Sequence, residues 1–170
     1  VSAERGPTNG VLGEDLPVPA ERSAALQRMR AVSDEHIAKL LDALGPEHCP
    51  GCKADINTAR RAQTYLTAAR ANIDRLTALP LHARSSDDLA DGVNRMIAVI
   101  PEFLPIVNAR TANITRGDPD VLNCLTLARL AADLREYAGQ LGSRFTGALA
   151  MHRALTLEEQ LAIERTQGRI

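Results

Sequence analysis

The chain has 170 residues and a formal net charge of −1, with 45% apolar residues and 20 basic against 21 acidic side chains. This apolar content is enough for one domain with a sizeable core, and it excludes an intrinsically disordered chain. The charges are mixed along the chain without a basic stripe, so we expect no nucleic-acid partner.

Aromatic residues make up only 2% of the chain, and tryptophan is absent. A core of alanine, leucine, isoleucine and valine favours closely packed helices over a β-sandwich. The most apolar run, residues 96–107, is too short to cross a membrane and contains two prolines. No signal peptide is visible, and the chain starts at Val1 without an initiator methionine, so we expect a fragment of a longer protein.

Residues 1–12 predict a short or frayed helix, weakened by Pro7 and Gly10, and residues 13–19 predict a break. The first long helix is predicted at about 20–44, because a glycine and a proline follow. The apolar spacing gives this helix one predicted buried face, made of Ala25, Met29, Val32, His36, Leu40 and Leu44.

A second helix is predicted at about 54–79, and Pro80 ends it. Its apolar residues alternate at steps of three and four, which is the spacing of a face that is buried against other helices. The members of this face are Ala59, Ala62, Leu66, Ala69, Ile73 and Leu76.

A third helix is predicted from about 85 to 117, opened by Ser85 with Asp88 three residues further on as a capping pair. Pro101 and Pro105 each remove a backbone donor, so we expect a kink there. The predicted buried face is made of Leu89, Val93, Met96, Ile100, Leu104, Val107, Thr111 and Ile114.

The fourth helix is predicted at 119–152, and the short link before it makes it an antiparallel neighbour of the third. We expect the other helices to cover its apolar face, since a helix of about 33 residues is roughly 50 Å long and cannot bury that face alone. Thr156 and Glu159 form a capping box that opens a final helix to about 168. The apolar face of 119–152 is made of Cys124, Leu127, Ala131, Leu134, Ala138, Leu141, Phe145, Ala148 and His152.

These elements predict an all-α fold, an up-down-up-down four-helix bundle with short extra helices at both ends. We expect a single domain over 1–170. Within it, residues 1–17 form a lead-in segment, residues 20–152 form the bundle, and residues 156–170 form a lead-out helix.

Two stretches carry a resemblance to a known group of proteins. One is ERGPTNGVL at 4–12, followed by a helix with Arg28, Arg30 and Asp34, and the other covers 132–170. Both resemble the all-helical extracytoplasmic sensor domains of bacterial transmembrane receptors, of the nitrate- and nitrite-sensing type. The resemblance implies a domain on the periplasmic side of the inner membrane, with both ends leading to membrane helices, in a homodimeric parent. Such parents are chemoreceptors, histidine kinases or cyclic-dinucleotide enzymes.

Cys49 and Cys52 form an HCPGC motif with His48, and Cys124 lies far along the chain. In a cytosolic protein this spacing favours metal or redox chemistry, with Cys124 as a possible fourth zinc ligand. In an exported protein it favours a disulfide, and because the resemblance implies export we expect Cys49 and Cys52 to be paired. Cys124 itself is expected to be a small buried residue.

Polar residues in the half of the bundle nearest HCPGC are candidates for a ligand pocket. His36 and Asn108 are predicted in one layer beside small alanines, and Tyr65, Arg110 and Thr111 lie close to that layer. The alternative is that His36 and Asn108 are core polar residues that satisfy each other or bind water. For the pocket we expect a small polar ligand or an anion, and no cofactor or metal.

The sequence contains no nucleophile–base pair, glycine-rich phosphate loop or HExxH motif, so we expect no enzyme. The expected function is ligand sensing, with a shift of helix 20–44 against helix 119–152 passed across the membrane. The alternative is a free-standing helical interaction or adaptor module that binds metal through the HCPGC loop.

Overall fold

A computed structural model of the chain describes residues 1–45, 48–49, 51–150 and 152–169. Every regular element in this part of the chain is helical, which confirms the all-α class. The α-helices are α1 (Arg5–Leu12), α2 (Ala20–Ala43), α3 (Lys53–Thr77), α4 (Ser86–Ala98), α5 (Leu104–Gly117), α6 (Leu122–Ala150) and α7 (Leu157–Gln167). Short 3-10 turns lie at Ser2–Glu4, Leu81–Ala83, Ile100–Phe103 and Pro119–Val121.

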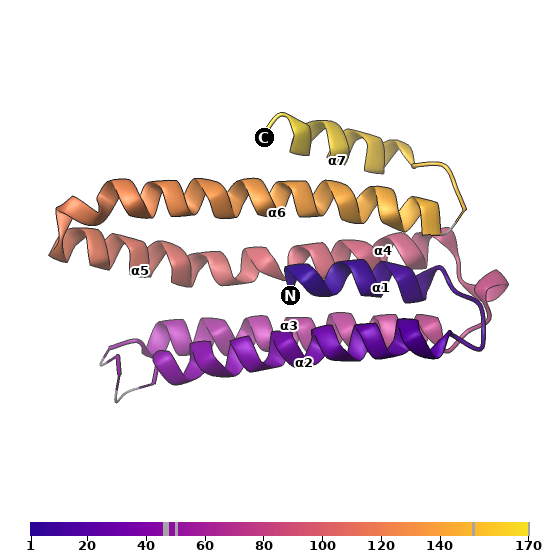
Figure 1. Cartoon of the computed structure of the whole chain (residues 1–170), viewed down its shortest axis with the longest axis horizontal. Coiled ribbons are helices and arrows are strands. Elements are labelled where there is room, and N and C mark those ends of the chain that lie inside the picture. Colours follow the sequence, from indigo (N-terminus) through magenta and orange to yellow (C-terminus); the bar gives the residue numbers. More distant parts are fainter. Residues whose placement is uncertain (46–47, 50, 151, 170) are drawn as a thin grey trace.

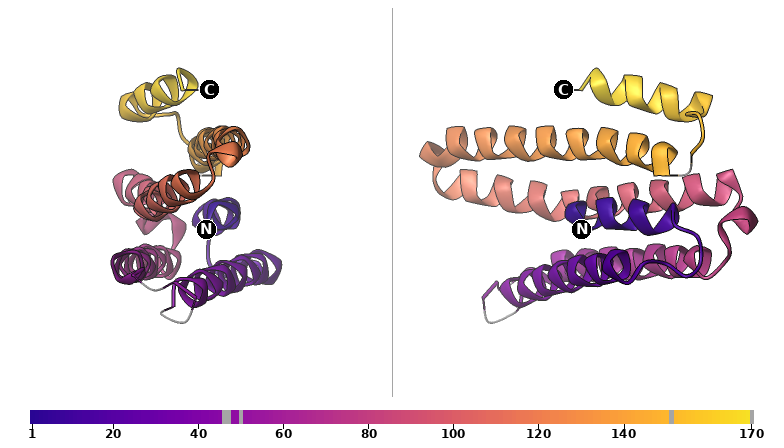
Figure 2. Two further views of the ribbon diagram at one scale, coloured as in Figure 1. Left: turned by 90° about the vertical axis from the view of Figure 1, so that its left-hand side faces the viewer. Right: turned by 45° about the vertical axis from the view of Figure 1, so that its right-hand side comes forward.

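The long helices α2, α3, α4–α5 and α6 run in alternating directions and are stacked in rows (Figure 1). α2 and α3 form one row, α1 and α4–α5 form the next, and α6 and α7 lie beyond them (Figure 2). The main core lies among α1, α2, α3 and α4. α1 contributes to this core whereas α6 does not, so the predicted bundle of four long helices is not confirmed.

The predicted buried face of α3 is confirmed. All six of its alanine, leucine and isoleucine residues are at most 1% exposed. The alternation of small and large side chains lets α1, α2 and α4 approach the α3 backbone closely. The predicted cap of α4 is confirmed as well, because the Ser85 hydroxyl accepts a hydrogen bond of 3.0 Å from the Asp88 backbone N–H.

The predicted kink between the two prolines of the third helix is present as the 3-10 turn at Ile100–Phe103, which separates α4 from α5. A 3-10 turn has fewer residues per turn than an α-helix, so it rotates the face that follows it. The predicted buried face is therefore correct through Met96 but wrong beyond the turn. In α5, Ile106 is buried, whereas Val107 and Ile114 are exposed.

The predicted buried face of the first long helix is correct at Leu44, which is buried, but it is wrong by about one residue in the middle of α2. Leu26, Ser33 and Ile37 are buried, whereas Val32 and His36 are exposed. This rotation brings the guanidinium of Arg30 inward, to 3.7 Å from the buried carboxylate of Glu4. Leaving a buried carboxylate without cationic partners costs more free energy than exposing one apolar side chain.

The prediction that the other helices cover the apolar face of α6 is wrong for most of its length, although Ala148 near its end is buried. Leu127, Leu130 and Leu134 are 68%, 60% and 51% exposed. α6 instead turns toward α1 a face of small and polar residues that includes Gly139. A Cβ atom at position 139 would lie only 2.7 Å from Nη2 of Arg5. The close approach of α1 requires that face and leaves the leucines outside.

α1 has eight residues, which confirms the predicted short helix, and it is among the most buried elements rather than frayed. Val11 and Leu12 belong to the main core, and Thr8 and Asn9 are buried. The end of α1 is held by Arg84, whose guanidinium donates to the carbonyl of Leu12 at 2.8 Å and to a carbonyl after α3. Burial lowers the pKa of Arg84, but the carbonyl acceptors satisfy its donors.

α7 is opened by the predicted capping box, in which Thr156 and Glu159 exchange backbone hydrogen bonds. It folds back along α6, rather than leading away from the bundle, and buries Ile163. Arg153 and Glu159 form an ion pair of 2.6 Å beneath its first turn. Among the described residues, none of the helices combines the length and the apolar character that a membrane crossing requires.

Candidate functional site

The first candidate site is a buried ion-pair cluster at the start of α1. Glu4 and Arg5 are adjacent in the sequence and are 0% and 2% exposed. Charged side chains are almost never buried to this extent without partners. Each of the two therefore depends on groups supplied by other helices.

Glu4 is held by the row that α2 and α3 form. Its two carboxylate oxygens accept hydrogen bonds of 2.8 Å from Nε and Nη2 of Arg70, which is on α3. Arg30 on α2 lies close to the same carboxylate. Burial by itself would lower the pKa of Arg70, but its hydrogen bonds to Glu4 and Asp34 raise that pKa above the ordinary value. Arg70 is thus a fixed cation.

Arg5 is held by α6, on the opposite side of α1. Its Nη1 and Nη2 donate to the carboxylate of Glu136 at 2.6 and 3.1 Å, and Nη2 also donates to the Ser2 hydroxyl. One turn further along α1, the Asn9 amide donates to the Ser143 carbonyl at 2.8 Å. α1 is therefore joined by directional polar contacts to α6 as well as to α2 and α3.

A groove of about 420 Å³ lies between α2 and α3 beside the Glu4 contacts. Two ion pairs cross it: Arg30 binds Asp74 at 2.8 and 3.0 Å, and Arg70 binds Asp34 at 2.7 Å. Gln27 and Thr67 complete its polar lining. The groove thus presents two guanidinium groups and two carboxylates, a set that can bind a small molecule with both a carboxylate and an ammonium group.

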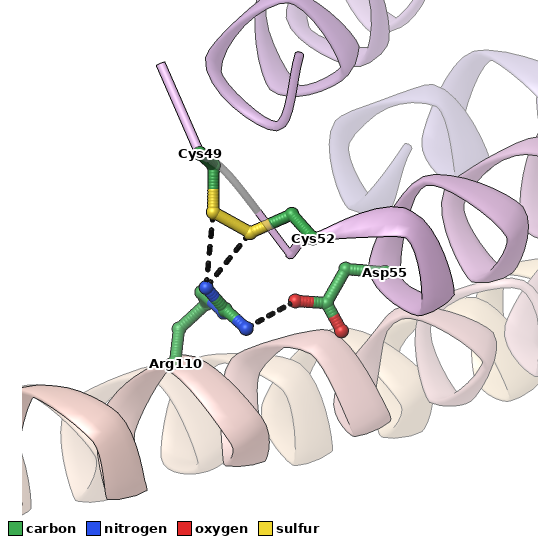
Figure 3. The surroundings of a disulfide bond; sticks show 4 residues. All are labelled: Cys49, Cys52, Asp55 and Arg110. Atoms are coloured by element: carbon green, nitrogen blue, oxygen red, sulfur yellow. Dashed lines mark hydrogen bonds and ion pairs between the residues drawn. A yellow bond between two sulfur atoms is a disulfide. The ribbon is translucent and has the colours of Figure 1, made fainter. Parts of the chain in front are cut away.

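The second candidate site surrounds the HCPGC loop (Figure 3). Cys49 and Cys52 form the predicted disulfide, with their Cα atoms 5.5 Å apart. Arg110 of α5 points at both sulfur atoms, with Nη1 at 3.2 and 2.9 Å, and its Nη2 lies 2.7 Å from the carboxylate of Asp55 in the first turn of α3. This arrangement clamps the loop to α5 and neutralises the buried Asp55.

The predicted pocket residues make no direct polar contact with one another in the described part of the chain. Among the described residues, no hydrogen bond or ion pair joins any two of His36, Tyr65, Asn108, Arg110 and Thr111. His36 is exposed on α2, and Tyr65 packs beside the main core. Asn108 is exposed and accepts a hydrogen bond from Arg129 of α6. His36 and Asn108 are exposed rather than core residues because α2 is rotated and α5 is offset by the 3-10 turn.

The zinc alternative finds no support in the geometry. Cys49 and Cys52 are bonded to each other, and Cys124 is exposed at the start of α6 rather than buried. Within the described ranges, no group of three or more histidine, cysteine or carboxylate side chains is placed to hold a metal ion.

The α1 cluster was missed because adjacent opposite charges and two glycines are typical of an exposed segment. One signal could have revealed the groove. Arg30 and Asp34 are four residues apart on α2, and Arg70 and Asp74 are four apart on α3. Because α2 and α3 are antiparallel, the arginine of each helix lies opposite the aspartate of the other. The ion pairs Arg30–Asp74 and Arg70–Asp34 show this arrangement.

Comparisons of the chain with protein-family models, with curated proteins and with solved structures find no match.

Proposed function

We propose that the chain is the extracytoplasmic ligand-sensing domain of a bacterial transmembrane signalling receptor, on the periplasmic side of the inner membrane and homodimeric in its parent. The observation that carries the proposal is the pair Glu4–Arg5. These neighbours bind opposite sides of the molecule, so a displacement of α2 and α3 relative to α1 is felt at α6. Coupling of this kind is what a signalling domain needs.

The Cys49–Cys52 disulfide supports the proposed periplasmic location. Disulfides persist in oxidising compartments such as the periplasm and are rare in the cytosol. The resemblance of residues 4–12 and 132–170 to periplasmic sensor domains agrees with this assignment.

The α2–α3 groove is the proposed ligand site. Asp34 and Asp74 are more than half exposed, so their ion pairs are weak and a ligand can replace them at little cost. A ligand carboxylate bound to Arg30 and Arg70 would compete with Glu4 for the same donors. It would then favour a different position of α1.

The size of the signal depends on the difference in ligand affinity between the two positions of α1. A hundredfold difference corresponds to about 2.7 kcal/mol, which one charge-assisted hydrogen bond and a few neutral ones can supply.

The experiment is calorimetric titration of small carboxylates, amino acids and inorganic anions into the wild type, Arg30→Lys and Arg110→Lys. Both substitutions keep the positive charge but lose the planar fork of donors, so they are matched. We expect one ligand class to bind, and Arg30→Lys to weaken it at least about tenfold, while Arg110→Lys leaves it unchanged.

Weakening by Arg110→Lys alone would move the ligand site to the disulfide end, where the sequence placed it. No binding by any member of the panel, to a folded wild type, would count against the sensor proposal.

A free-standing helical interaction module is the second candidate, and the exposed leucines of α6 favour it. The two functions differ in the parent gene. Membrane helices encoded on both sides of the 170-residue region support the sensor, whereas their absence supports the interaction module.

A further inference from the structure

The outer face of α6 is a continuous apolar surface. It consists of Cys124, Leu127, Ala131, Leu134, Ala138, Leu141 and Phe145, with Leu130 and Leu149 at its edges. Leu127, Leu134 and Phe145 are 68%, 51% and 43% exposed, whereas Leu141 is half-buried and Ala148 is buried, so the face is open over most of the helix. Single exposed leucines are ordinary, but a row of this length is not.

Charge is nearly absent from this face. Of the charged residues on α6, Glu136 is bound to Arg5, and Arg129 is bound to Asp133. Arg144 is half-buried and donates to Asn94 of α4. Among the described residues of α6, Arg135 is the one charged side chain that is exposed.

The area of this face is close to the area that a specific protein–protein interface buries. A helix of 29 residues is about 44 Å long and presents a strip about 10 Å wide. Two such strips give a projected area of about 900 Å², which is close to the roughly 1,000 Å² that a specific interface needs.

We propose that the outer face of α6 pairs with the same face of a second copy of this chain, with the two α6 helices parallel. The three-and-four spacing is that of a helix packed along a partner with the same spacing, and a second copy has it by definition. In a parallel pair the leucines 127, 134 and 141 form layers that alternate with layers of Ala131 and Ala138. The alanine layers let the helix axes approach.

The parallel direction rests on the proposed receptor function, because both copies must then face one membrane. It also places Arg135 beside Leu130 of the second copy, so no like charges meet across the pair.

Cys124 gives a direct test, because it lies at the start of the same face and is exposed. Cys49 and Cys52 are already paired, which leaves Cys124 as the free thiol. In a parallel pair the two copies of Cys124 are adjacent. In an antiparallel pair centred on Ala138 they are about 40 Å apart, since each residue adds 1.5 Å.

The experiment is mild oxidation of the purified 170-residue chain, followed by non-reducing electrophoresis and mass spectrometry. We expect a dimer joined through Cys124, and none in Cys124→Ser. A second protein, Cys124→Ser with Ala138→Cys, should also form a dimer, because position 138 meets its counterpart in either direction. Cross-linking at 138 but not at 124 would show antiparallel pairing, and cross-linking at neither would show no pairing; both results overturn the proposal.

Sedimentation separates pairing from chance collision of thiols. Leu134→Glu should weaken dimerisation at least about tenfold, because a carboxylate would be buried between two apolar faces. Val32→Glu is the matched control, as it places the same charge at an exposed apolar position of α2. Equal effects of the two would overturn the α6 interface.

Loss of pairing with ligand binding intact contradicts only this interface. Pairing without ligand binding contradicts only the sensor.

Discussion

Glu4 and Arg5 have opposite charges and adjacent positions, yet they do not neutralise each other. Consecutive residues of a helix point in different directions, so neither can fold back onto its neighbour. Glu4 takes its partners from α2 and α3, and Arg5 takes its partner from α6. At the scale of single residues, α1 is thus secured by two separate ion pairs.

Glu4→Gln should lower the free energy of unfolding by about 3 kcal/mol, because it leaves the guanidinium of Arg70 facing a buried neutral amide. Glu35→Gln is the control, since Glu35 pairs with Lys39 on the exposed side of α2 and contributes little. Urea unfolding followed by circular dichroism measures both. A Glu4→Gln protein as stable as the control would show that the buried pair does not support the fold.

Glu159 should make the docking of α7 depend on pH. Hydrogen bonds from Arg153, together with the backbone N–H of Thr156, hold the pKa of Glu159 below its usual range despite burial. A carboxyl whose pKa is lowered by folding adds stability that is present above its ordinary pKa. That stability is lost as the pH falls through the lowered value.

Hydrogen exchange of the α7 amides measures this effect. At neutral pH, Glu159→Gln should exchange faster in α7 than the wild type does. The difference should shrink once the pH is below the folded pKa of Glu159, because the wild-type carboxyl is then protonated too. A difference that is constant across this range would contradict the role of the charge.

At the scale of elements, α6 approaches α1 through Gly139, where a Cβ atom would meet the buried guanidinium of Arg5. Gly139→Ala should therefore destabilise the protein by about 1–3 kcal/mol through overpacking. Gly142→Ala, three residues on, meets nothing within 4 Å. It should stabilise the helix by up to about 1 kcal/mol, because alanine favours a helix over glycine. Thermal unfolding of the two variants measures this difference. Shifts of the unfolding temperature in the same direction for both variants would contradict the role of Gly139.

The contrast between α3 and α6 shows what apolar spacing can predict. In both helices it identified one apolar face, and in α3 that face is buried. In α6 the buried side is instead the one with Gly139 and Ser143, which no hydrophobic pattern reveals. Spacing identifies a face that suits a helical partner, but not whether that partner belongs to the same chain.

The candidate sites show a similar division. The Cys49–Cys52 bond was predictable because its geometry is local. The predicted pocket required the relative rotation of α2 and α5, and a rotation of one residue moved His36 to the surface. The burial of Glu4 could not be predicted from its neighbours, because its partners lie on two later helices.

At the scale of the whole molecule, α6 and α7 form an outer layer that α1 joins to the main core (Figure 2). Glu136→Gln should loosen this layer, since it removes the charge that Arg5 binds. We expect amide exchange to rise most in α6 and α7 and least in α3. Asp74→Asn, at an exposed pair on the far side, is the control. Uniform loss of protection in every helix would show that the molecule opens as one unit.

The central position of α1 also has a consequence for the order of folding during synthesis. Within this region α1 is synthesised before the other α-helices, yet Arg70 follows Glu4 by 66 residues and Glu136 follows Arg5 by 131. The α2–α3 hairpin can form early from local contacts, but α1 cannot close its polar contacts until most of α6 has been made. A nascent chain released before Glu136 therefore holds Arg5 without its carboxylate, and such truncated products should be open to proteolysis in the segment around α1.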